Sequence, residues 1–204
     1  MGQLAIHISY PCSSESVTHD SQTPSEWVVR WSHLVRVGGS VLDVACGHGR
    51  HMKWFAARGH AVTGVDRSPD AIAVSLAYGE AICADIENNP WPLVSEKGTL
   101  RQFDAVVVTN YLWRANFPNM CSSLLPGGLL IYETFTAGNE TVGKPSRPDF
   151  LLNSGELLLA FPQTRIVAFE DGFLSEPNRF VQRIAAIKLS TGTNRDSLPQ
   201  RYPL

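Results

Sequence analysis

Three acidic residues and two glycines occupy positions at which a nucleotide-like ligand would contact them. Asp43 lies near the end of an apolar run, and Gly47 and Gly49 follow in a turn that precedes a helical pattern. Glycines let the backbone approach a ligand without an intervening Cβ. Asp66 closes the next apolar run, 19 residues after Gly47, at the spacing of a carboxylate that binds ribose hydroxyls. Asp85 ends a third run, where it can accept a hydrogen bond from an exocyclic amine.

The turn itself discriminates among nucleotide ligands. A dinucleotide turn needs a third glycine, but Met52 stands at that position. A triphosphate loop would end in Gly-Lys-Ser/Thr, whereas this turn reads GHGRH. Asp43 would repel a pyrophosphate and favour a cationic group. The pattern therefore predicts S-adenosylmethionine, whose amino-acid arm carries an ammonium and a sulfonium.

Apolar runs alternate with helical patterns along most of the chain. Continuous apolar strands separated by helices are typical of a parallel sheet covered on both faces. The last two runs have no helix between them, so they predict an antiparallel hairpin. The expected strands are 40–45, 60–66, 80–85, 103–110, 129–135, 164–173 and 179–190, and the expected helices lie within 25–35, 50–59, 68–79, 116–128 and 154–161.

The chain divides into three parts by composition. Residues 1–24 are rich in Ser and Thr and are expected to form a flexible arm or lid. Residues 25–190 carry the alternating pattern of one domain, and residues 191–204 form a tail. The polar segment 136–153 is rich in Gly and Pro, and a loop of that length is usually functional.

Composition narrows the classes of partner. Apolar residues make up 44% and charged residues 18% of the 204 residues, and the net charge of −2 disfavours nucleic acid. No apolar stretch is long enough for a membrane span, and no secretory signal is evident. Cys12, Cys46, Cys83 and Cys121 form no C-x-x-C pair, so we expect reduced thiols, no metal and a cytoplasmic protein. A small-molecule substrate is favoured, and the sequence carries no signal for an oligomeric state.

At this point the sequence resembles the class I S-adenosylmethionine-dependent methyltransferases. The resemblance rests on VLDVACGHGRH, VTGVDRSPDAI, ICADIEN, FDAVVVTNYLWR and LLPGGLLIYETF, and it covers residues 27–189. Within the class the chain looks most like small bacterial single-domain methyltransferases of the tellurite-resistance type. The resemblance implies a doubly wound α/β fold, a Rossmann-like seven-stranded sheet of order 3-2-1-4-5-7-6 with an antiparallel last strand.

The resemblance also implies roles for residues around the sheet edge. Asp43, Gly47 and Gly49 would hold the methionine arm, Asp66 the ribose, and Asp85 with Ile86 the adenine. Asn110 would face the methionine part and the substrate. Helical spacing adds Arg30 as a possible carboxylate clamp, and Arg50 crowds the turn. The expected cofactor-binding set is Asp43, Ala45, Gly47, Gly49, Asp66, Arg67, Asp85, Ile86, Asn110 and Arg30.

The acceptor site is expected beyond the ends of the fourth and fifth strands, because open α/β sheets bind ligands there. Methyl transfer is an in-line displacement that mainly needs alignment, and a base only if the acceptor carries a proton. Candidates for such a base are Glu133, His51 and Tyr111, and the sequence does not select among them. The expected acceptor wall comprises Tyr111, Trp113, Arg114, Glu133, Phe135 and Arg147.

Two other classes of function remain open at this stage. An NAD-dependent oxidoreductase would need glycine at position 52 and no carboxylate at position 43. A non-catalytic module that binds S-adenosylmethionine or another nucleotide is also compatible, because a fold does not guarantee chemistry.

Overall fold

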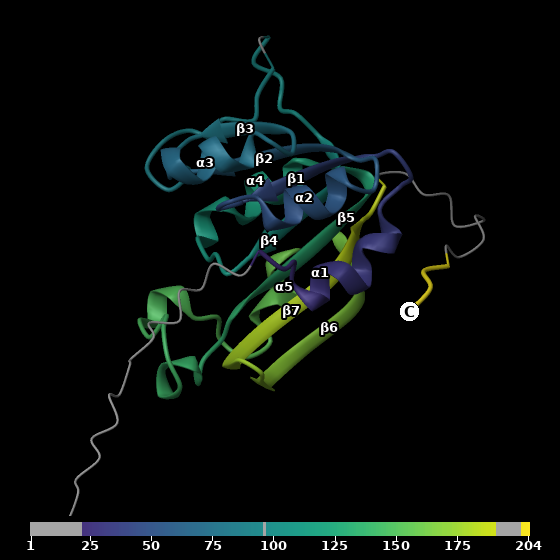
Figure 1. Ribbon diagram of the computed structural model, residues 1–204. Helices are drawn as coiled ribbons and strands as arrows, with labels where there is room; N and C mark the ends of the chain where they lie inside the picture. The colour runs from purple at the N-terminus through teal and green to yellow at the C-terminus, as the bar shows by residue number, and fades with distance from the viewer. Residues whose placement is uncertain (1–21, 96, 191–200) are drawn as a thin grey trace, which may run out of the picture.

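The computed structural model describes residues 22–95, 97–190 and 201–204. They form a seven-stranded sheet of order β3-β2-β1-β4-β5-β7-β6 with helices on both faces (Figure 1). The expected fold class and strand order are confirmed. The predicted arm and tail lie outside the described residues except at 22–24 and 201–204. The strands are β1 (Ser40–Val44), β2 (Ala61–Asp66), β3 (Glu80–Cys83), β4 (Phe103–Thr109), β5 (Leu124–Phe135), β6 (Thr164–Ser175) and β7 (Asn178–Lys188).

Strand direction follows the connections. β1 pairs in parallel with β2 and β4, and β4 pairs in parallel with β5. β7 runs antiparallel to β6, because only a tight turn joins these two strands, and β7 also pairs antiparallel with β5. One register line across the sheet joins Thr109, Glu133, Arg183 and Glu170 on β4, β5, β7 and β6. The carboxyl ends of β1 to β5 therefore lie along one edge of the sheet.

The helices are short, and the first is shorter than predicted. The amphipathic pattern over residues 25–35 becomes α1 followed by a 3-10 turn, where the Ser32 hydroxyl donates to the Val29 carbonyl. Ser25 caps α1 and Ser68 caps α3, as their residue types indicate. The elements are α1 (Glu26–Trp31), η1 (Ser32–Leu34), α2 (Arg50–Ala56), α3 (Pro69–Ser75), η2 (Arg114–Asn116), α4 (Phe117–Ser122), η3 (Asn139–Thr141), η4 (Pro148–Phe150) and α5 (Glu156–Ala160).

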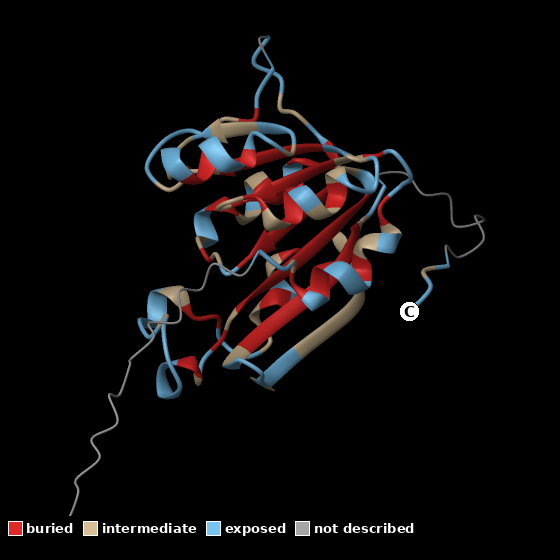
Figure 2. Ribbon diagram, in the orientation of Figure 1, coloured by how far each residue is buried: buried red, intermediate tan, exposed pale blue. Residues whose placement is uncertain are grey.

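Each face of the sheet has its own apolar core. Trp27 and Trp31 of α1 and Phe55 of α2 pack on one face. Met120 of α4 and Leu157 of α5 pack on the other. Figure 2 shows the central strands buried beneath these two layers. Because both faces are covered, the edge at the carboxyl ends of the strands is where the fold leaves room for a ligand.

Candidate functional site

The turn after β1 has an unusual backbone. Ala45, Gly47 and Gly49 have φ values of 54°, 53° and 77°, in the left-handed region. A Cβ added at Gly47 would meet no atom within 4 Å, so the space beside the turn is open. A Cβ at Gly49 would lie 2.9 Å from the Ser75 Cβ. Gly49 therefore serves the packing of the turn on α3, and Gly47 serves the open side.

Met52 occupies the place of the third glycine, and the close packing comes from another residue. A Cβ added at Gly64 of β2 would collide with the Met52 sulfur and lie 2.8 Å from the Cys46 sulfur. The glycine at position 64 of β2 thus allows the close approach of helix and strand that a third glycine at position 52 of α2 would otherwise allow. The motif spacing did not point to Gly64, although a glycine within a strand often marks a place where another part of the chain approaches the backbone closely.

Two adjoining cavities open at the carboxyl ends of β1 to β4. The larger, about 290 Å³, we call the arm cavity; the smaller, about 140 Å³, we call the base cavity. They share Ala45, Asp66 and Tyr111, so they form one continuous site. The arm cavity is lined by Ala45, Cys46, Gly47, His48, Arg50, His51, Asp66, Thr109, Asn110 and Tyr111. The base cavity is lined by Ala45, Asp66, Arg67, Ala84, Asp85, Ile86, Glu87 and Tyr111.

Asp66 stands at the junction of the two cavities. Its Oδ2 accepts from the Gly47 N–H (2.9 Å) and its Oδ1 from the Ser68 N–H (2.9 Å). One carboxylate thus fixes the glycine turn to the start of α3. Each oxygen keeps a second lone pair for a ligand hydroxyl.

Asp85 stands at the far end of the base cavity. Its carboxylate accepts from the Glu87 N–H (3.0 Å) and from the Asn88 side-chain amide (2.8 Å). These hydrogen bonds, that of Asn88 foremost, hold the pKa of Asp85 below its usual value. Ile86 lies beside it, buried, and also lines the cavity. The base cavity thus pairs an acceptor with an apolar surface.

Asp43 lies beneath the arm cavity rather than on its surface. The side chain is buried, and its Oδ2 has no hydrogen-bond partner. The His51 Nδ1 lies 3.9 Å from that oxygen. Burial, partly offset by the charge of Arg50, raises the pKa of Asp43 to about 7. An unpartnered buried carboxylate oxygen is rare and marks a place where a ligand or solvent contact is missing.

The surroundings of His51 do not suit its expected role as a general base. The Ser25 N–H donates to its Nε2 (3.1 Å), so the acceptor nitrogen is already occupied. Burial and the Arg50 charge lower the pKa of His51 to about 3. The general-base prediction for His51 is therefore wrong, because the ring is committed to α1.

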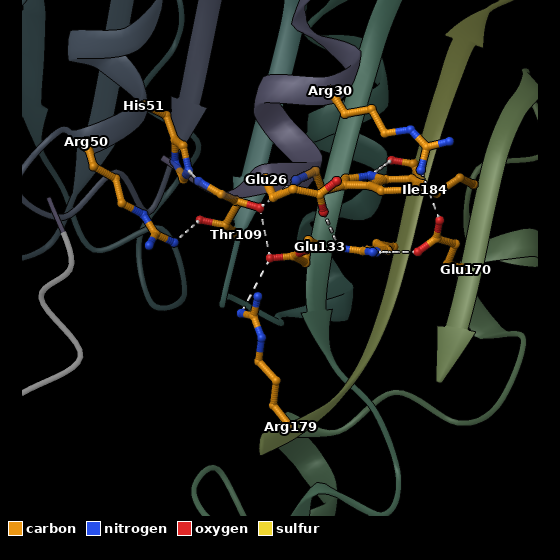
Figure 3. Close-up of polar contacts among 12 residues, drawn as sticks. Glu26, Arg30, Arg50, His51, Thr109, Glu133, Glu170, Arg179 and Ile184 are labelled. Carbon is orange, nitrogen blue, oxygen red and sulfur yellow. Dashed lines mark hydrogen bonds and ion pairs between the residues drawn. The ribbon is translucent and has the colours of Figure 1, made fainter. Parts of the chain in front are cut away.

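The surroundings of Glu133 also do not suit its expected place in the acceptor wall. Its side chain is fully buried, and its Oε1 accepts from the Ser25 hydroxyl (3.1 Å). Arg183 lies 3.3 Å from Oε2 and Arg179 lies 3.5 Å from Oε1 (Figure 3). The prediction that Glu133 lines the acceptor site is wrong, because two arginines and a serine surround the carboxylate.

Arg183 links this carboxylate to two others. Its guanidinium contacts Glu26 of α1 (3.1 Å) and Glu170 of β6 (2.6 Å), and it stacks 4.7 Å above the Trp27 ring. We call Glu26, Glu133, Glu170, Arg179 and Arg183 the ionic cluster. It docks α1 on β5, β6 and β7.

Arg30 belongs to the rim of the ionic cluster. It pairs with Glu170 at 3.3 Å and stacks on Trp31, and it lines neither cavity. The clamp predicted for Arg30 is therefore wrong. Arg50 instead lines the arm cavity, where it donates to the Thr109 hydroxyl (3.2 Å).

The segment after β4 carries the remaining candidates. Asn110 has a φ of 55°, and its N–H donates to the Glu133 carbonyl (2.9 Å), which exposes its side chain at the arm cavity. Tyr111 lines both cavities, and burial raises its pKa to about 12. The Asn116 amide donates to its hydroxyl (3.3 Å). A phenol with so high a pKa is a poor base at neutral pH but an able hydrogen-bond donor.

Trp113, Arg114 and Arg147 line a third cavity of about 460 Å³ together with Leu112, Asp149 and Phe150. We call it the outer groove; it begins one residue after Tyr111. Arg114 braces the groove, because it binds both Glu156 oxygens (2.6 and 2.9 Å) and the Leu151 carbonyl (2.9 Å). Phe135 is half-buried and lines none of the three cavities, so its place in the acceptor wall stays a prediction.

Within the residues that the structure describes, no group of three or more His, Cys, Asp or Glu side chains is arranged to hold a metal ion. No helix of the described ranges is long and apolar enough to cross a membrane.

The strand order is that of the class I methyltransferase fold. Residues 41–128 match the family described as a methyltransferase domain. The structure of TehB from Haemophilus influenzae is similar, with a TM-score of 0.64 at 18% identity over 79% of this chain and 61% of that chain. A TehB-like S-adenosylmethionine-dependent methyltransferase from Corynebacterium glutamicum gives 0.55 at 17% identity, over 80% of this chain and 88% of that one. The expected resemblance to the tellurite-resistance type is therefore confirmed at the level of the fold.

Curated relatives match only part of their own length. A tRNA U34 carboxymethyltransferase from Klebsiella pneumoniae is 26% identical over 136 residues, which is 61% of this chain and 40% of that protein. A ubiquinone biosynthesis O-methyltransferase from Methylobacterium sp. (strain 4-46) is 30% identical over 102 residues, 48% of this chain and 41% of that protein. The chain thus spans about two fifths of these relatives' length. Neither of the alternative functions finds support among these similarities.

Proposed function

We propose that the protein transfers the methyl group of S-adenosylmethionine to a small-molecule acceptor by in-line displacement. The observation that carries the proposal is the joined pair of cavities, with Asp66 at the junction and Asp43 beneath the arm cavity. The bound cofactor supplies a methyl group on a positively charged sulfur. The protein's part is to bind, orient and exclude water.

The residues present fit this cofactor. The open side of Gly47 and the exposed Asn110 suit the amino-acid arm, and the unpartnered oxygen of Asp43 suits its ammonium. The free lone pairs of Asp66 suit the ribose hydroxyls. Asp85 and Ile86 suit the amine and the face of the adenine, and Ala45 and Arg67 line the same cavity. Gly49 contributes indirectly, by letting the turn pack on α3.

We expect the acceptor to bind between the arm cavity and the outer groove. Tyr111 and Trp113 offer apolar and hydrogen-bonding surface, and Arg147 stacks 5.1 Å over Phe150 at the groove's rim. The net charge of −2 favours a small molecule over a nucleic acid. The free thiols of Cys46, Cys83 and Cys121 suit a reducing compartment, so we assign the protein to the cytoplasm.

Titration calorimetry and a product assay test the proposal. We expect S-adenosylmethionine and S-adenosylhomocysteine to bind and NAD not to bind. A panel of thiols, phenols, amines and bulk tRNA then reports which acceptor releases S-adenosylhomocysteine. NAD binding in place of the sulfonium would overturn the cofactor. Binding without turnover on any acceptor would favour a binding module, and methylated tRNA would replace the small-molecule acceptor.

A further inference from the structure

A series of contacts leads from Ser25, the N-cap of α1, through His51 to the buried carboxylate beneath the arm cavity. The Ser25 N–H donates to the His51 Nε2 at 3.1 Å. The His51 Nδ1 lies 3.9 Å from the unpartnered Oδ2 of Asp43. Both side chains are only 2% exposed, so no bulk solvent separates them.

The contact with Ser25 fixes which nitrogen of His51 carries the proton. A neutral imidazole has one donor and one acceptor nitrogen. Because Nε2 accepts the Ser25 N–H, the proton resides on Nδ1. Burial lowers the pKa of His51 to about 3, so the ring stays neutral throughout the neutral pH range. His51 therefore presents a fixed N–H group on the side of Asp43.

The other groups around Asp43 are few. Arg50 of α2 attracts its charge, whereas Asp66 at the end of β2 repels it. The Met52 N–H of α2 donates to the carboxylate, and the thiol of Cys46 lies in its field. The neighbours in register on β2 and β4 are Gly64 and Val107, which carry no charge.

We propose that His51 is a positioning residue for the charge of Asp43 beneath the arm cavity. The dipole of its Nδ1–H, 3.9 Å from Oδ2, stabilises the ionised carboxylate electrostatically without a hydrogen bond, and the ionised carboxylate attracts the ammonium of the cofactor's amino-acid arm. The affinity for the cofactor therefore rises with pH until Asp43 is fully ionised. This inference rests on the proposed function, because it takes the amino-acid arm to occupy the arm cavity.

The pH window follows from the sign of the shift. Burial raises the pKa of Asp43 to about 7, so the carboxyl group is largely protonated below that value. A ligand that needs the ionised form binds about tenfold more tightly for each pH unit gained below the inflection, and levels off above it. The neutral His51 contributes no titration of its own there.

The first experiment measures the dissociation constant of S-adenosylhomocysteine by calorimetry between about pH 6 and pH 8. This product keeps the ammonium group but lacks the sulfonium charge, so it isolates the amino-acid arm. We expect the affinity of the wild-type protein to rise over this range with an inflection near the Asp43 pKa. Asp43→Asn should bind more weakly and with no such slope. A slope that persists in Asp43→Asn would overturn the inference.

The second experiment separates the two nitrogens of His51. In His51→Asn, an amide nitrogen stands near the Nδ1 position and still presents an N–H group to Asp43. In His51→Gln, the polar group reaches the Nε2 position and can still bind Ser25, but the donor toward Asp43 is gone. We expect His51→Asn to keep the inflection and His51→Gln to move it upward by about one unit, which weakens binding about fivefold at pH 7.

His33→Asn is the matched control, because His33 is an exposed histidine that bonds to backbone carbonyls away from both cavities. We expect it to leave the pH profile unchanged. Equal profiles for His51→Asn and His51→Gln would overturn the positioning role while leaving the proposed function intact. Failure of the wild-type protein to bind S-adenosylhomocysteine at any pH would instead remove the proposed function, and the inference with it.

Discussion

Two carboxylates at the carboxyl edge of one sheet have opposite surroundings. Asp43 near the end of β1 is buried with an oxygen that meets no donor. Glu133 near the end of β5 is equally buried, but both its oxygens face donors, from Ser25, Arg179 and Arg183. The first arrangement costs stability and the second depends on complete pairing.

The difference between Asp43 and Glu133 indicates different roles for the two halves of the carboxyl edge of the sheet. In the half formed by β1 to β4, polar groups with spare lone pairs line the arm and base cavities. In the half formed by β5 to β7, the charged groups of the ionic cluster pair with one another and dock α1 (Figure 3). A carboxylate at a strand end therefore marks a ligand site only when its neighbours leave it incomplete.

The largest expected effect comes from breaking the paired side. Glu133→Gln removes the buried negative charge and leaves Arg179 and Arg183 under-compensated. We expect the free energy of unfolding to fall by about 3 kcal/mol, measured by urea denaturation. Glu170→Gln touches the same arginine from a half-exposed position, so it should cost less than about 1 kcal/mol. Equal losses for the two variants would contradict the contrast between buried and exposed carboxylates.

Removing the charge of the unpaired carboxylate, Asp43, should raise the free energy of unfolding rather than lower it. The pKa of Asp43 is raised from 3.8 to about 7 in the fold, so ionising it there costs stability. That cost grows as pH rises from about 4 to about 7 and is constant above. Asp43→Asn should therefore stabilise the ligand-free protein by about 2 kcal/mol at pH 8. In urea denaturation this gain should vanish near pH 4; a loss of stability at pH 8 would contradict it.

A substitution of Asp66, at the junction of the two cavities, should change the affinity for the cofactor. Asp66→Ala removes an acceptor of charge-assisted hydrogen bonds, so we expect cofactor binding to weaken by about tenfold or more in calorimetry. Asp70→Ala is the matched control, because Asp70 lies in the first turn of the same α3 that follows Asp66. An unchanged dissociation constant in a folded Asp66→Ala protein would remove Asp66 from the ribose site.

Much of the fold could be predicted from the sequence because its signals are local. Alternating apolar runs and helical patterns predicted a mostly parallel sheet with a terminal hairpin, whereas the strand order came from the resemblance to the methyltransferases. Ser25 and Ser68, both of residue types that favour N-caps, cap α1 and α3. The interruption of the first helix at Ser32 depended on one side-chain hydrogen bond, which spacing alone does not reveal.

The site was predictable where a residue acts by its position at a strand end. Asp66 and Asp85 needed only the strand boundaries and the glycine turn to be placed at the cavities, whereas Asn110 was placed there by the resemblance to the methyltransferases. Glu133 and His51 were assigned wrongly because their partners, Arg183 and Ser25, lie 50 and 26 residues away in the chain. Pairing across the sheet is a tertiary property, and one sequence carries no local signal for it.

The smallest expected effects fall in the outer groove and compare two of its arginines. Arg114 holds two Glu156 oxygens and two backbone carbonyls, whereas Arg147 meets Asp149 with both side chains more than 70% exposed. Urea denaturation should show a loss of about 1 kcal/mol for Arg114→Met and of less than about 0.5 kcal/mol for Arg147→Met. Because Arg114 ties down the segment before α5, its variant alone should be cleaved faster by protease within residues 136–153. Equal cleavage of both variants would mean that the segment is held by other contacts, and the outer groove would then be no more rigid at Arg114 than at its solvent-exposed rim.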